Sequence, residues 1–316
     1  TALQLSLHVL DLPVDAEVLV ADFTFPATAN IVVAEGLKPV LVDINLDTFT
    51  MDPLNLERRI TEKSRAVIPV HAFGCSADME AIMAVAEKYR LAVIEDAACA
   101  LATTYKGGFV GTFGDFGCFS FHPRKAITTG EGGMITTNNE ALAEKIELLR
   151  NHGGVKGELY YRYEEAGYNY RLSDIQGAVG VAQMEKLDWI LEKKRELAAQ
   201  LRAMLNGIEG IIPPAEPAWG GHVYQSFVVM LDESIDRDGL ITLMRANGVE
   251  TTLGTYAVHA QPFYRRTYGY SPGDLPNSYK AFAHALTLPL YPQMDEIDLS
   301  KIVNALIKSI SELEFN

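Results

Sequence analysis

The 316-residue sequence has little cysteine and no surplus of positive charge. Its three cysteines, Cys75, Cys99 and Cys118, form no C-x-x-C pair. A small, odd set of this kind predicts no disulfide framework and favours a reducing, cytoplasmic compartment. The net charge of −14 argues against nucleic acid or an anionic membrane surface as the main partner. It leaves room for a small anionic ligand, because such a ligand needs only a local pocket of donors.

Long apolar runs are also missing. No run reaches the ~18 residues that a membrane-spanning helix requires, so the sequence predicts no membrane association. The segment 1–13 has neither a basic stretch nor a small-residue cleavage site, and is therefore not interpreted as a signal peptide. It starts without methionine and directly in a helix-like pattern, so we expect an upstream segment to be missing.

Several functional motifs are absent as well. There is no G-x-x-x-x-G-K-[ST] loop, and the glycines at 130–133 do not match G-x-G-x-x-G, so no motif supports a nucleotide-binding loop. No two histidines have the H-x-x-x-H or H-E-x-x-H spacing, and we expect no metal site. A hydrolase that uses Ser120 and Lys125 is disfavoured because the two lack the S-x-x-K spacing.

What is present is an alternation of buried strands and helices. Near-continuous apolar runs at 17–21, 39–43, 66–70 and 91–95 predict strands buried on both faces, with helices between them. This order predicts an α/β fold with a large, mostly parallel sheet. A capping box at Ser173 and Gln176 predicts the start of one long helix. The pattern then changes, and we expect a large domain at 1–198 and a smaller α+β domain at 199–316.

Asp96 and Lys125 are the first candidates for a functional site. Asp96 ends an apolar strand, and Lys125 follows 29 residues later, which is enough for one connection and one more strand. Ligands gather at the carboxyl ends of the strands in such sheets. An acid and a lysine placed there suit pyridoxal 5′-phosphate (PLP), whose aldehyde forms a Schiff base with lysine and whose ring nitrogen an acid keeps protonated. The spacing alone favours a simpler explanation, either a buried ion pair between the two or two unrelated surface residues.

Five motifs in order resemble the DegT/StrS family of PLP-dependent sugar aminotransferases. They are the segments at 22–30 (DFTFPATAN), 69–74 (PVHAFG), 93–98 (VIEDAA), 120–133 (SFHPRKAITTGEGG) and 167–176 (GYNYRLSDIQ). The resemblance covers nearly the whole chain. It implies the aspartate-aminotransferase fold, called fold type I, and a homodimer. It also implies amino transfer, usually from glutamate, to a keto group of a nucleotide-linked sugar.

The resemblance assigns roles to the residues at the cofactor. Lys125 matches the family's Schiff-base lysine, Asp96 the partner of the pyridine nitrogen, and Ser120 a phosphate ligand. Phe25 matches the aromatic residue that stacks on the cofactor ring, although by itself a phenylalanine is more often a core residue. Cys99 stands where the family usually has Gln or His beside the cofactor's 3′ oxygen. Because a thiol is a weak donor, this contact is weakened or replaced here.

The resemblance also assigns roles beyond the cofactor's own pocket. Asn169 matches a residue that reaches the cofactor phosphate of the partner subunit, and Arg171 one that faces substrate phosphates. A turn-forming Asn and a helix-entry salt bridge are the simpler explanations of these two residues. His259 matches a sugar-contacting histidine, while His71 and His122 are expected to be structural. The family's phosphate-binding Gly-Thr pair would precede residue 2, and only Thr1 of that segment is present.

The expected function is therefore a PLP-dependent sugar aminotransferase, located in the cytoplasm. Two alternatives stay open: a PLP-binding regulatory or scaffold protein without catalysis, and a PLP-dependent sugar dehydratase. Some dehydratase relatives carry His at the position of Lys125, and Lys125 therefore favours amino transfer.

Overall fold

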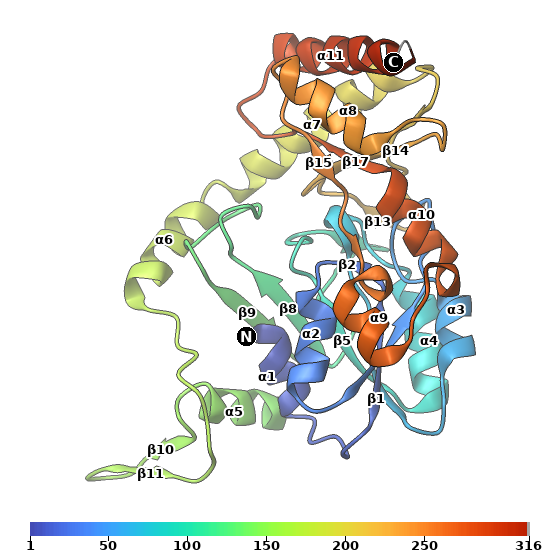
Figure 1. The fold of residues 1–316 in the computed structure, drawn as a ribbon. Helices are drawn as coiled ribbons and strands as arrows, with labels where there is room; N and C mark the ends of the chain where they lie inside the picture. Colours follow the sequence, from blue (N-terminus) through green and yellow to red (C-terminus); the bar gives the residue numbers. More distant parts are fainter. Residues whose placement is uncertain (315–316) are drawn as a thin grey trace.

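The computed structural model describes residues 1–314, in which a large α/β unit lies below a smaller one (Figure 1). A six-stranded sheet of order β3-β1-β4-β5-β8-β9 forms the centre of the large unit. Its first five strands are parallel, and only β9 is antiparallel to its neighbour. This confirms the predicted α/β fold class. The strands are β1 (Glu17–Ala21), β3 (Lys38–Val42), β4 (Ser64–Ile68), β5 (Ala92–Asp96), β8 (Phe116–Ser120) and β9 (Gly133–Thr136).

Both faces of this sheet are covered, which explains the continuous apolar runs. In β1, Val18 and Val20 belong to one core cluster, whereas Leu19 and Ala21 belong to another on the opposite face. Helices α1 (Ala2–His8), α2 (Ala27–Ala34) and α5 (Glu140–Leu149) supply the first cluster, and α3 (Pro53–Arg59) and α4 (Met79–Tyr89) the second. Successive strand residues point to opposite faces, so a strand between two helical layers needs apolar side chains at every position.

The smaller unit has an antiparallel sheet covered by helices. Its order is β12-β14-β17-β15, and its apolar cluster combines β12, β14 and β17 with the second half of α7 and with α8 and α11. The bounds are β12 (Ile211–Ile212), β14 (Phe227–Leu231), β15 (Thr252–Leu253), β17 (Ala285–Leu288), α7 (Leu187–Leu205), α8 (Arg237–Ala246) and α11 (Glu296–Glu314). The predicted α+β character of the C-terminal part is confirmed.

The long helix predicted from Ser173 is wrong in one respect, because the chain forms two helices there. The capping box of Ser173 and Gln176 starts α6 (Asp174–Met184), which ends before Glu185, and α7 starts at Leu187. The predicted domain boundary between 198 and 199 lies inside α7. The first turns of α7 pack with Ile127 of the large unit, and its later turns pack into the smaller one. Helix α7 therefore connects the two units.

Part of the C-terminal segment returns to the large unit. Strand β16 (Tyr256–Ala257) pairs with β2 (Phe23–Thr24), and Tyr264 packs into the core below the parallel sheet. The remaining elements are β6 (Thr104–Tyr105), β7 (Gly108–Phe109), β13 (Gly220–Gly221), η1 (Ala72–Gly74), η2 (Val258–Ala260), η3 (Pro272–Asp274), α9 (Pro262–Tyr268) and α10 (Pro276–His284). A division by sequence position alone thus separates segments that share one core.

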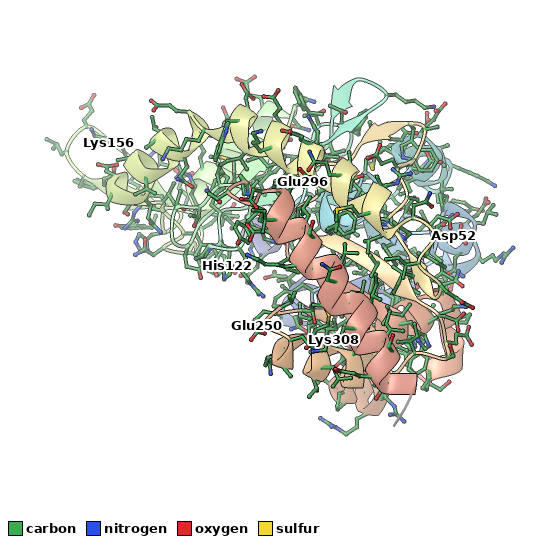
Figure 2. All side chains as sticks on the ribbon, turned by 90° about the horizontal axis from the view of Figure 1, so that it is seen from above. Asp52, His122, Lys156, Glu250, Glu296 and Lys308 are labelled. Atoms are coloured by element: carbon green, nitrogen blue, oxygen red, sulfur yellow. The ribbon has the colours of Figure 1, made fainter. Side chains whose placement is uncertain are left out.

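One region projects from the rest, and we call residues 154–184 the arm. It contains the hairpin of β10 (Gly154–Lys156) and β11 (Tyr161–Tyr163), followed by α6. Seen from above α11, Lys156 stands far from Glu296 and Lys308 (Figure 2). Helix α6 buries none of its residues, and even the apolar side chain of Ile175 is 80% exposed. An apolar helix without a buried side lacks the packing that usually stabilises helices.

Candidate active site

Asp96 is the last residue of β5, in the middle of the parallel sheet. Its side chain is 5% exposed and has two fixed partners. The hydroxyl of Thr28 donates to Oδ2 at 2.7 Å, and the N–H of Ala98 donates to Oδ1 at 3.1 Å. Thr28 comes from α2 and is 68 residues away in sequence. The carboxylate therefore has a defined orientation at the carboxyl ends of the strands.

Glu95, the neighbouring carboxylate, points to the other face and has a structural role. Its fully buried side chain receives hydrogen bonds from the N–H groups of Gly111, Phe113 and Gly114 and lies 3.0 Å from His71 Nε2. Burial acts to raise the pKa of Glu95, but the bond and charge of His71 and these N–H groups hold it below the usual value. The expected structural role of His71 is confirmed. Since alternate side chains of a strand point oppositely, Glu95 cannot take the place of Asp96.

Lys125 lies in the loop after β8 and reaches toward the end of β5. The ammonium nitrogen is 3.0 Å from the sulfur of Cys99, which follows Asp96 by three residues. Locally, Lys125 N–H donates to the carbonyl of His122 at 2.9 Å, and Ile127 anchors the loop in a buried cluster. The pairing of β5 with β8 sets Asp96 opposite Cys118. The structure thus brings the predicted acid and amine to adjacent strand ends.

Ser120 and Phe25 lie at the ends of strands of the same unit. Ser120 is the last residue of β8 and is half-buried, and its hydroxyl accepts the N–H of His122 at 3.3 Å. Phe25 follows β2 and is 61% exposed, so it is not a core residue. The Thr28 hydroxyl lies 3.3 Å from the carbonyl of Phe25 as well as beside Asp96. The side chain of Thr28 therefore contacts both Phe25, the predicted ring-stacking residue, and Asp96, the predicted acid.

Asn169 and Arg171 lie elsewhere, in the arm. Both are exposed. Asn169 forms an isolated bridge with Asn151, and the guanidinium of Arg171 donates to Asn151 Oδ1 at 2.8 Å. Their contacts within the chain thus explain a local turn, and their roles at a cofactor or substrate stay predictions.

His259 is placed differently from its prediction. The sequence suggests a sugar contact, but the side chain is 0% exposed. Its Nδ1 lies 2.6 Å from Asp22 Oδ2, and its Nε2 lies 3.4 Å from the carbonyl of Pro272. Burial opposes protonation, yet the bond and charge of Asp22 raise the pKa of His259. The predicted sugar contact is wrong in this structure, because both ring nitrogens and the whole surface of the ring are taken by the protein.

Two residues near the site were not found by sequence reasoning. Thr28 lies within a recognised segment, but only the fold reveals its bond to Asp96. Lys194 of α7 is 6% exposed and donates from Nζ to the carbonyl of Gln225 at 3.0 Å. Burial lowers its pKa to about 8, and the charge of Cys99 opposes part of this effect. A lysine between Lys193 and Arg195 resembles part of a charged helix surface, so the sequence contains no signal for its burial.

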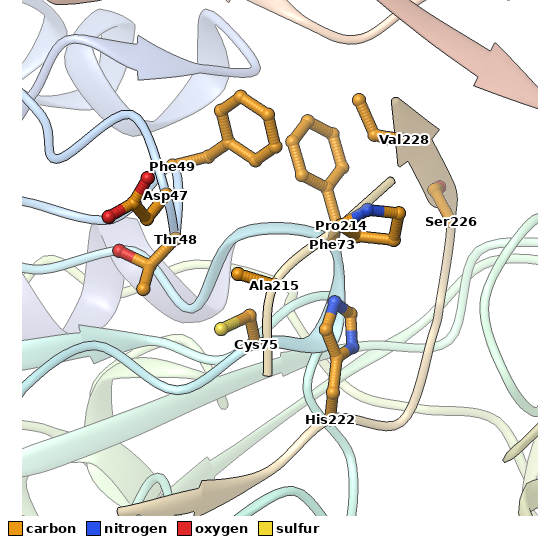
Figure 3. Close-up of a pocket in the computed structure, with 10 residues that line it drawn as sticks. All are labelled: Asp47, Thr48, Phe49, Phe73, Cys75, Pro214, Ala215, His222, Ser226 and Val228. Carbon is orange, nitrogen blue, oxygen red and sulfur yellow. The ribbon is translucent and has the colours of Figure 1, made fainter. Parts of the chain in front are cut away.

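A separate small cavity lies between the two units. Figure 3 shows His222 and Cys75 beside it, with the rings of Phe49 and Phe73. None of the predicted site residues lines this cavity. Within residues 1–314 no group of three or more His, Cys, Asp or Glu side chains is placed to hold a metal ion. The strand ends around Asp96 and Lys125 are therefore the better candidate site.

Comparison with known proteins decides the family. Residues 1–307 match the model of the DegT/DnrJ/EryC1/StrS aminotransferase family. The chain belongs to this family. It is similar to the spore coat polysaccharide biosynthesis protein SpsC of Bacillus subtilis, with 37% identity over 302 residues, which are 92% of this chain and 78% of SpsC. The family is one of PLP-dependent sugar aminotransferases, and the chain is a PLP-dependent enzyme.

Solved structures support the same assignment. The chain resembles the putative sugar aminotransferase Spr1654 of Streptococcus pneumoniae, known in PLP and PMP forms, with a TM-score of 0.94 for the PMP form and 26% identity. That match covers 99% of this chain and 85% of Spr1654. The S. venezuelae protein DesV matches with a TM-score of 0.90 and 33% identity, over 97% of this chain and 81% of DesV. The fold is therefore that of PLP-dependent aminotransferases.

The side chains present fit PLP. The cofactor needs an amine for its aldehyde, an acid for its ring nitrogen, and donors for its phosphate. Lys125 offers a partly exposed amine, Asp96 a carboxylate held by two hydrogen bonds, and Ser120 a hydroxyl at a neighbouring strand end. The exposed ring of Phe25 is available to cover a planar ligand.

Proposed function

We propose that this enzyme transfers an amino group from glutamate to a keto group of a nucleotide-linked sugar. The observation that carries the proposal is the meeting of Lys125 with Cys99 at the end of the strand that carries Asp96. Family membership and the names of two relatives, a spore coat polysaccharide biosynthesis protein and a sugar aminotransferase, support a sugar as acceptor. We further propose that the enzyme acts in the cytoplasm. No helix within residues 1–314 is long and apolar enough to cross a membrane.

Each residue of the proposed site has its own role in the reaction. When bound, PLP supplies an aldehyde that takes up amines and a ring that accepts electrons. Asp96 keeps a proton on the ring nitrogen, and Thr28 and Ala98 keep the carboxylate oriented for this. Lys125 would hold the cofactor through its amine and would also move the proton at the substrate carbon. Ser120 donates to the phosphate, Phe25 covers the ring, and Cys99 lies at the lysine end of the site.

We propose that the arm packs against a second copy of the chain in a homodimer. Its exposed apolar side chains need a cover, and a second copy of the chain provides one by two-fold symmetry. They are Leu159 (92% exposed), Tyr160 (72%), Tyr163 (69%), Ile175 (80%) and Val181 (66%). Asn169 and Arg171 lie in sequence between the residues of the hairpin and those of α6. We propose that these two residues reach the cofactor phosphate and the substrate in the partner's site.

Spectroscopy with defined substrates tests the proposal. Glutamate alone should remove the absorbance band of the lysine-bound cofactor and yield one equivalent of the keto acid. Addition of the right keto sugar should restore the band. A panel of keto sugars, each with and without a linked nucleotide, identifies the acceptor, and a panel of amino acids in place of glutamate identifies the donor. A band that no amino donor changes would favour a non-catalytic PLP-binding protein.

A further inference from the structure

The sulfur of Cys99 and the amine of Lys125 form a pair of nucleophiles in direct contact. Their separation is 3.0 Å, and both side chains are partly exposed. Cys99 follows β5 and Lys125 follows β8, so the contact depends on the sheet and not on sequence proximity. Because lysine has a flexible side chain, a small movement brings nitrogen and sulfur to bonding distance.

The other two cysteines provide an internal contrast. Cys75 and Cys118 are each 2% exposed, and Cys118 also contacts the hydroxyl of Ser6 at 3.3 Å. Burial raises the pKa of both thiols to about 12. Figure 3 shows Cys75 among the side chains that line the small cavity. Buried thiols of this kind are inert, and Cys99 differs from them in both exposure and contact.

Lys194 is a second amine near Cys99. Its charge interacts with that of Cys99, but its nitrogen is held by the carbonyl of Gln225 at 3.0 Å in a buried position. Lys125 is therefore the amine that can approach the sulfur.

We propose that Cys99 and Lys125 form a reversible sulfur–nitrogen bond when a hydroperoxide oxidises the thiol. In the first step the thiol attacks one peroxide oxygen, the O–O bond breaks, and sulfenic acid and water (or an alcohol) result. In the second step the neutral amine attacks this sulfur, the S–O bond breaks, and water leaves. Sulfur is oxidised by two electrons, the peroxide is reduced by two, and the amine loses one proton.

The bond acts as a switch on cofactor loading. An amine bonded to sulfur cannot bind an aldehyde, and two equivalents of a small thiol restore thiol and amine while forming one disulfide. Conversely, a cofactor bound to Lys125 keeps the amine away from Cys99. This protection rests on the proposed role of Lys125, whereas the bond itself rests only on the contact.

Peptide mapping of the full-length protein tests the bond directly. The chain is treated with hydrogen peroxide, with and without PLP, and digested with trypsin without reduction. We expect the peptide containing Cys99 to be linked to one containing an uncleaved Lys125, at a mass about 2 Da below their sum. Dithiothreitol should release both peptides. Cys75 and Cys118 should stay unmodified.

Two variants separate the steps. Cys99→Ser removes the sulfur and should abolish the link. Lys125→Arg keeps a positive charge but no reactive amine, so oxidation should stop at sulfenic acid, which a 1,3-dicarbonyl probe traps. Oxidised Cys99 without a link in the parent protein, a link to Lys194, or an unreactive Cys99 would each overturn the proposal. A link that forms equally in the presence of PLP would uphold it and would instead contradict Lys125 as the cofactor's anchor.

Discussion

The hydroxyl of Thr28 donates a 2.7 Å hydrogen bond to the carboxylate of Asp96, across 68 residues of sequence. This bond couples α2, which follows Phe25, to the end of β5. It orients the acid that we propose to act on the cofactor nitrogen.

Replacement of Thr28 by Val should weaken catalysis while the fold is kept. The change preserves the shape of the side chain but removes the donor, and a hydrogen bond to a charged group contributes about 1.5–3 kcal/mol. We expect kcat to fall by at least about tenfold, which corresponds to about 1.4 kcal/mol. Thr28→Ser keeps the hydroxyl and is the matched control. Equal rates for Val and Ser would show that the bond does not matter for the reaction.

Asp96→Asn should leave PLP bound and greatly slow turnover. A neutral amide cannot hold the ring nitrogen protonated, and one preorganised electrostatic group contributes about 3–4 kcal/mol to a rate. Steady-state kinetics and cofactor content, measured together, check both parts. Glu95→Gln is the contrasting variant and should mainly lower stability, because Glu95 is bonded to His71 and three N–H groups. Near-normal turnover of the Asp96 variant would remove Asp96 from the mechanism.

Lys125→Ala should remove the protein-linked cofactor band. Borohydride reduction in the presence of PLP should then attach no cofactor at this position, as intact mass shows. Lys106→Ala, which changes an exposed lysine paired with Glu80, should behave like the parent. If the Lys125 variant kept a covalent cofactor, Lys194, with its pKa of about 8, would be the next amine to replace.

A subunit-mixing experiment decides whether active sites are shared. Chains with Lys125→Ala and chains with changes at both Asn169 and Arg171 are unfolded together, refolded and assayed. With shared sites, each mixed dimer has one intact site, so random pairing should restore roughly a quarter of the parent activity. Each variant alone, refolded in the same way, must be nearly inactive. Sites built within one chain predict no recovery at all.

The pair of His259 and Asp22 should make stability depend on pH. The folded-state pKa of His259 is raised, so the folded chain binds a proton that the unfolded chain loses above about pH 6.5. The free energy of unfolding should therefore fall as the pH rises from that value through the raised pKa. Urea unfolding at several pH values measures this slope.

His259→Gln should abolish this pH dependence and lower the stability by about 3–5 kcal/mol, because Asp22 is left buried without its charged partner. A variant of normal stability with a raised KM for the sugar would restore the original prediction of a substrate contact for His259.

The sequence by itself determined the features that depend on local chemistry. Buried runs such as 17–21 marked the parallel strands because a strand covered on both faces has apolar residues at every position. The cap at Ser173 marked a helix start because its side chain accepts the N–H of Gln176, three residues away. Asp96 and Lys125 became candidates because strand ends in α/β sheets carry ligands, and the family resemblance then gave them their roles.

Only the tertiary structure decided what depends on distant neighbours. The contact of Lys125 with Cys99, the bond of Thr28 to Asp96 and the burial of Lys194 join segments 26 or more residues apart. His259 became a structural residue because the C-terminal segment returns to the large sheet and places it on Asp22. Burial and hydrogen bonding are set by packing between segments, and a residue's own sequence neighbours do not determine them.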